Sequence, residues 1–159
     1  MSSRIIDSMI WLLIVAVGFF VLSVVSFQKI RSTPGKIRFT YAWAFLIGSF
    51  VWEDIMIFSL YFGVSFLVSF LMSSVKLAML FFLLFWLIRS AGEALYFFLQ
   101  QFIEPKHFPH HIDSHFTILR RIFGDLSEQQ CFIIMQVLMQ SICMLSAGAI
   151  LVLLFGIPG

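Results

Sequence analysis

The chain has 159 residues, of which 61% are hydrophobic and 11% are charged. An average soluble domain is roughly 45–50% apolar and about 25% charged, so this composition excludes an ordinary water-soluble protein. The formal net charge of +2 is too small to predict nucleic-acid binding. Both cysteines, Cys131 and Cys143, lie in the same apolar run, too far apart along one helix to form a disulfide.

The first predicted element is an uncharged apolar run, Met9–Phe27, which is long enough to cross a bilayer. It is longer than the core of a signal peptide and is not followed by a small-residue cleavage site, so we interpret it as a retained span. It carries no polar stripe and is expected to pack mainly against lipid. Residues 28–40 follow as a basic loop with the turn signal Thr33-Pro34-Gly35.

The next apolar stretch, Tyr41–Phe102, is too long for one helix. It predicts two spans, over residues 41–72 and 76–102, folded as a hairpin. Its most polar break is Ser73-Ser74-Val75-Lys76, where we place the turn. A turn at Gly63-Val64-Ser65 is the alternative.

The polar connection after the third span predicts a short helix and then a fourth span. Its residues 114–123 place four apolar side chains on one helical face: Phe116, Leu119, Ile122 and Phe123. This pattern is typical of an amphipathic helix in the membrane interface. Ser127, with Gln130 three residues later, predicts a capping box at the start of the last span, residues 128–155.

The sequence therefore predicts an all-α polytopic membrane protein. It is expected to form a single transmembrane domain, residues 1–159, with a four-helix bundle and an interfacial helix between helices three and four. Basic residues concentrate in loops 28–40 and 103–127, so the positive-inside rule places both loops in the cytoplasm. The N- and C-termini are then expected outside, in a protein of the plasma (inner) membrane.

Several polar side chains interrupt the apolar spans, where they mark either interhelical networks or functional sites. Counted from the predicted helix ends, the side chains of Glu53, Glu93, Gln136 and Gln140 lie about 12–18 Å along three helices, which predicts one common layer. The whole polar cluster comprises Glu53 and Asp54 in the second span, Arg89, Glu93, Tyr96 and Gln100, which form one polar stripe on the third, and Gln136 and Gln140 in the last. The spacing of Arg89 and Glu93 allows them to pair within one helix.

Two functions fit this layer. In the first, the chain is a non-catalytic membrane subunit or scaffold whose charge network fixes helix packing. In the alternative, a small oligomeric transporter or channel moves protons or cations past the carboxylates of Glu53, Asp54 and Glu93. The expected partners are the lipid bilayer and either further copies of the chain or another membrane protein. An enzyme is disfavoured because no nucleophile has a suitable base beside it, and no cofactor is predicted.

Four histidines lie in the second basic loop: His107, His110, His111 and His115. Their spacing is compatible with metal ligation. Pro109 interrupts any regular helix over all four, and no cysteine lies nearby. Contact with lipid headgroups is the commoner role for interfacial histidines, so these residues are only weak candidates for metal ligands.

Overall fold

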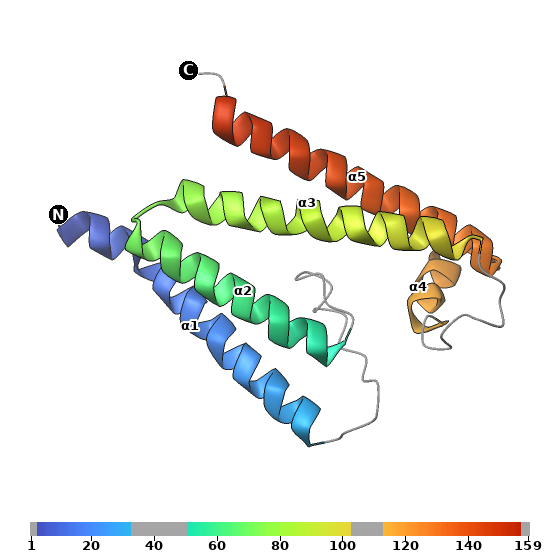
Figure 1. Ribbon diagram of the computed structural model, residues 1–159, viewed down its shortest axis with the longest axis horizontal. Helices are drawn as coiled ribbons and strands as arrows, with labels where there is room; N and C mark the ends of the chain where they lie inside the picture. Colours follow the sequence, from blue (N-terminus) through green and yellow to red (C-terminus); the bar gives the residue numbers. More distant parts are fainter. Residues whose placement is uncertain (1–2, 33–50, 103–112, 157–159) are drawn as a thin grey trace. The chain divides into compact units, whose positions relative to one another are not determined.

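The computed structural model describes residues 3–32, 51–102 and 113–156. The helices in this part of the chain are α1 (Ser3–Arg31), α2 (Trp52–Leu71), α3 (Val75–Gln100), α4 (Asp113–Phe123) and α5 (Glu128–Phe155) (Figure 1). Of these, α1, α2, α3 and α5 are long and apolar enough to cross a membrane. The predicted fold class is confirmed: the chain is an all-α polytopic membrane protein with a short helix between its third and fourth long helices.

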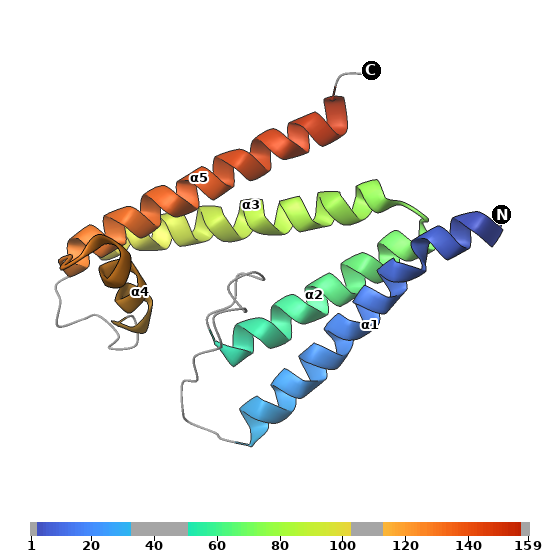
Figure 2. The same cartoon turned by 180° about the vertical axis from the view of Figure 1, so that it is seen from behind.

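The chain divides into two compact units, Met1–Phe82 and Leu83–Gly159, and α3 contributes to both. In the first unit, α1 and α2 lie side by side and antiparallel in both views (Figures 1 and 2). In the second unit, α3 and α5 converge where α3 ends and α5 begins, and α4 lies beside that end. The single transmembrane domain over the whole chain stays a prediction.

Tight side-chain packing joins α1 to α2. On α1, the side chains of Leu12, Ala16 and Ser26 are fully buried. The ring of Phe19 stacks on that of Phe66 with centroids 5.8 Å apart. One face of α1 therefore packs on α2, where small residues allow a close approach. Only 22% of the apolar stretch of this span is buried within the chain, so packing of its remaining surface against lipid stays a prediction.

Hydroxyl groups add polar contacts to this hairpin. The Oγ of Ser23 on α1 donates to the carbonyl of Met56 on α2 at 3.0 Å. The Oγ of Ser26 donates to the carbonyl of Leu22 within α1 at 2.7 Å. The two helices pack closely at Gly63, where an added Cβ would lie 3.0 Å from two ring carbons of Phe20. Gly63 therefore lies within α2 as a contact point for α1, and not in a turn.

The chain turns between α2 and α3 over residues 72–74, at the first of the two predicted places. Ser73 has a φ of 50°, in the left-handed region. The Oγ of Ser74 accepts a hydrogen bond from the backbone N–H of Leu77 at 3.2 Å, which satisfies a free donor at the start of α3. The hydroxyl of Tyr61 on α2 donates to the carbonyl of Phe81 on α3 at 2.9 Å.

The start of α2 differs from the prediction. Val51 is extended, with φ −127° and ψ 163°, and the helix begins at Trp52 rather than near residue 41. Residues 33–50 lie outside the described part of the chain. A helix of 20 residues is about 30 Å long and already matches the hydrocarbon core, so α2 does not need the eleven preceding residues of the predicted span, 41–51, in order to cross it.

The core of the second unit joins α3, α4 and α5. Phe132 of α5 lies at its centre, with ring centroids 5.0 Å from Phe116 of α4 and 6.2 Å from Phe97 of α3. The buried members of this core are Ala94, Phe97, Phe116, Leu119, Cys131, Phe132, Met135 and Met139. The predicted apolar face of α4 is thus partly used inside the protein.

A short connection joins α4 to α5. Gly124 has a φ of 85°, a conformation that favours glycine, and ends α4. Arg120 Nε donates to the carbonyl of Leu126 at 3.2 Å. The predicted capping box is present: Ser127 Oγ accepts from the N–H of Gln130 at 3.2 Å, and Gln130 Oε1 accepts from the N–H of Ser127 at 2.9 Å.

Replacing Ser127 with alanine should destabilise the first turn of α5 by about 1 kcal/mol, because one N–H loses its acceptor. Amide hydrogen exchange over residues 128–130 should then become several-fold faster. The matched control is Ser141→Ala, since the Oγ of Ser141 donates only to the carbonyl of Val137 one turn back in the same helix. Equal exchange rates in the parent chain and in Ser127→Ala would refute the role of the cap.

Candidate functional site

Arg89 and Glu93 form an ion pair within α3. The Nη2 of Arg89 lies 2.6 Å from the Oε1 of Glu93, one helical turn further on. The helix ends at Gln100, so the two residues lie about 16 Å and about 10 Å from its end. The side chains are 25% and 13% exposed. The candidate site therefore contains a compact, neutral charge pair deep within a span.

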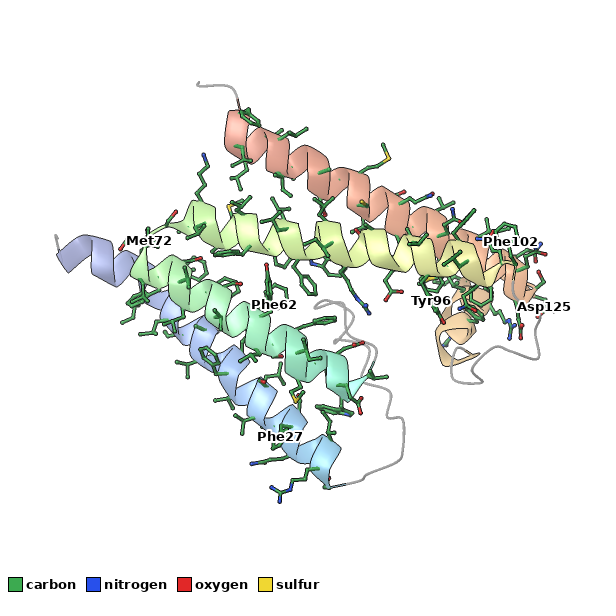
Figure 3. The ribbon with its side chains drawn as sticks, in the orientation of Figure 1. Phe27, Phe62, Met72, Tyr96, Phe102 and Asp125 are labelled. Atoms are coloured by element: carbon green, nitrogen blue, oxygen red, sulfur yellow. The ribbon has the colours of Figure 1, made fainter. Side chains whose placement is uncertain are left out.

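The predicted polar stripe on α3 continues from this pair towards the helix end. Tyr96 is 38% exposed one turn beyond Glu93 (Figure 3), and its ring meets that of Phe97 edge-on at 5.4 Å. Gln100 is half-buried at the last residue of the helix. Between the charged residues, the fully buried Ser90 donates its hydroxyl hydrogen to the carbonyl of Trp86.

A hydrogen bond joins the end of α3 to α5. It is made by Gln101, which the sequence analysis did not include among the candidate residues. Gln101 Nε2 donates to Gln136 Oε1 at 2.6 Å and to the carbonyl of Phe97 at 3.1 Å. The spacing pattern favoured Gln100, which continues the stripe. However, α3 ends at Gln100, so Gln101 lies in the following turn and reaches α5. Gln140, one turn beyond Gln136, is exposed.

Glu53 and Asp54 do not lie deep within a helix, so the predicted distance of Glu53 from its helix end is wrong. They occupy the first turn of α2, where carboxylates favourably oppose the positive end of the helix dipole. Lys29 and Arg31 lie in the last turn of α1. The Lys29 ammonium is 5.7 Å from the centre of the Trp52 ring. Charges beside a tryptophan at the ends of two spans are typical of the membrane surface.

The histidine cluster falls mostly outside the described residues. This applies to His107, His110 and His111, whereas His115 belongs to α4 with a side chain that is not described. In the part of the chain that the structure does describe, no three histidine, cysteine, aspartate or glutamate side chains are grouped to hold a metal ion. The metal hypothesis for the four histidines stays a prediction.

Both cysteines are free thiols. Cys131 is fully buried in the core of the second unit, next to Arg120, and Cys143 is half-buried.

A comparison with models of protein families found no match, and comparisons with curated proteins and with solved structures found none. The function therefore has to be inferred from the chemistry of this chain.

Proposed function

We propose that the chain is a non-catalytic membrane subunit, a scaffold that holds other membrane-spanning helices. The observation that carries this proposal is the pairing of Arg89 with Glu93 inside one helix. The pair is formally neutral, so it neither attracts a cation nor needs one. A neutral pair that keeps some exposed surface within a span suits contact with a polar group on a neighbouring helix.

The surfaces of the long helices support this function. Within the most apolar stretch of each helix, only 11% of α5 and 17% of α3 is buried inside the chain. Towards the end of α5, Met144, Leu145 and Val152 are each more than two-thirds exposed. These apolar surfaces are available to lipid and to the helices of partners, which on this proposal are further copies of the chain or another membrane protein.

The transporter alternative depended on three carboxylates at one depth. Of these, Glu53 and Asp54 lie in the first turn of α2, and Glu93 is paired with Arg89.

For the scaffold we also propose the plasma (inner) membrane, with loops 28–40 and 103–127 in the cytoplasm and both termini outside. The basic residues in the last turns of α1 and α4 support this orientation.

Two measurements on the full chain test the scaffold. In mild detergent, it should co-purify with one membrane protein, or with itself, at a fixed ratio. Replacing the pair with leucines (Arg89→Leu with Glu93→Leu) should weaken that association about threefold to tenfold, as expected for interhelical polar contacts. A matched control, Ile88→Leu, changes a highly exposed neighbour without touching the pair and should leave the association intact.

Flux assays in reconstituted vesicles separate the two functions. For a scaffold, proton and potassium flux should equal that of protein-free vesicles. A flux that disappears in Glu93→Gln but persists in Glu53→Gln would overturn the scaffold and favour transport. Purification of the parent chain from its native membrane as a lone monodisperse monomer would also count against the scaffold.

A further inference from the structure

The last turn of α4 carries an apolar surface that the core does not use. Phe116 and Leu119 are buried, at 1% and 9% exposed, against the core of the second unit. Ile122 and Phe123 are 67% and 61% exposed, and Arg121 next to them is exposed as well. The helix thus has one apolar contact inside the protein and a second apolar pair outside it.

The contacts of α4 fix its depth relative to two spans. Phe132, which packs on Phe116, is the fifth residue of α5, and Phe97 is the fourth residue from the end of α3. At 1.5 Å per residue, both rings are attached within about 6 Å of the span ends. The helix α4 is therefore held at the level where α3 leaves the bilayer and α5 enters it.

That level is the headgroup region. The 26 residues of α3 and the 28 of α5 are each about 40 Å long, so they exceed a hydrocarbon core of about 30 Å by roughly 5 Å at either end. Phe102, just beyond α3, is 73% exposed at the same end of the unit as Asp125 (Figure 3). Exposed aromatic side chains at this depth are typical of the membrane interface.

We propose that the last turn of α4 inserts Ile122 and Phe123 into the boundary between the lipid headgroups and the acyl chains, with the guanidinium of Arg121 at the lipid phosphates. The partner of this surface is the bilayer that α3 and α5 already cross. Amphipathic helices bind membranes in this way, with apolar side chains below and cationic groups at the headgroups.

The charges nearby predict which lipids are needed. Arg120 is held by the carbonyl of Leu126. Among the described residues at this turn, the exposed Asp125 and Glu128 offset the positive charge of Arg120 and Arg121. Insertion should therefore depend on apolar contact and on the phosphate that every phospholipid carries, and not on a net anionic surface.

Site-directed spin labelling in vesicles tests this proposal. A nitroxide is attached at Phe123→Cys, in a full-length chain in which both native cysteines are serine and whose helical content is checked first. The control label is at Asp125→Cys, two residues further on and exposed. We expect the label at position 123 to collide more often with oxygen than with a water-soluble nickel chelate, and the control label to show the reverse.

The measurement is repeated at Ile122→Cys, in vesicles of phosphatidylcholine alone and in vesicles that also contain phosphatidylglycerol. The same preference for oxygen in both lipids supports the proposal. Equal access of the nickel chelate to the labels at positions 122, 123 and 125 would overturn it. If the labels entered the bilayer only in vesicles that contain phosphatidylglycerol, insertion would depend on anionic lipid, and the inference that it does not would be wrong. Labels that neither reagent reaches would show that a second copy or another protein covers the turn, and would overturn a lipid partner.

Discussion

Replacing Gly63 with leucine should break the packing between α1 and α2. A Cβ at position 63 would already lie 3.0 Å from the ring of Phe20, and leucine adds three further carbons at that place. Overpacking of this kind costs typically about 1–3 kcal/mol. Unfolding of the full chain in mixed detergent micelles should therefore show a loss of stability of this size.

A glycine in α1 provides a matched control. Gly18 is exposed, and an added Cβ there would have no neighbour within 4 Å. The variant Gly18→Leu has the same gain in helix propensity as Gly63→Leu but no clash, so it should be at least as stable as the parent. Adding Phe20→Ala to Gly63→Leu should restore part of the loss. If Gly63→Leu were as stable as Gly18→Leu, the close contact at Gly63 would not exist.

Glu93→Gln should be the most damaging single change at the ion pair. It removes the carboxylate that lies 2.6 Å from the guanidinium of Arg89 inside a span, and arginine does not lose its charge in proteins. An arginine near the centre of a span costs about 2.5–3.5 kcal/mol on insertion scales. Insertion efficiency of α3 and unfolding of the full chain measure this loss.

Removing Arg89 instead of Glu93 should cost less stability. In Arg89→Leu the remaining Glu93 can take up a proton and become neutral, which arginine cannot do. The double variant Arg89→Leu with Glu93→Leu removes both charges and should insert at least as well as the parent chain. With the single variants Arg89→Leu and Glu93→Leu, this double variant completes a double-mutant cycle that gives the coupling energy of the pair. If Glu93→Gln and Arg89→Leu reduced insertion and stability equally, the positive charge left on Arg89 would not be the cause of the loss.

The long helices could be predicted because their apolar runs end at clear signals. Ser127 and Gln130 marked the start of α5, and the serines at positions 73 and 74 marked the turn before α3. The start of α2 was not predicted because hydropathy does not distinguish an apolar residue in a helix from Val51, which is extended. A usable signal was present, since acidic residues such as Glu53 and Asp54 favour the first turn of a helix.

The candidate site was predictable only where it depends on spacing within one helix. Arg89 and Glu93 are four residues apart, so any α-helix brings them together. The contact between Gln101 and Gln136 depends on where α3 ends and how α5 approaches it. A shift of one residue at a helix end changes which glutamine faces the neighbour, and sequence patterns do not fix helix ends that closely.

The location of the ion pair within one helix also bears on how the protein is made. A pair between two helices forms only after both have entered the bilayer, so each charge must first cross alone. Arg89 and Glu93 meet as soon as a single turn of α3 has formed. With only residues 72–74 between them, α2 and α3 leave the ribosome almost together. The third span can therefore enter the membrane during synthesis with its charges already neutralised, before the rest of the chain exists.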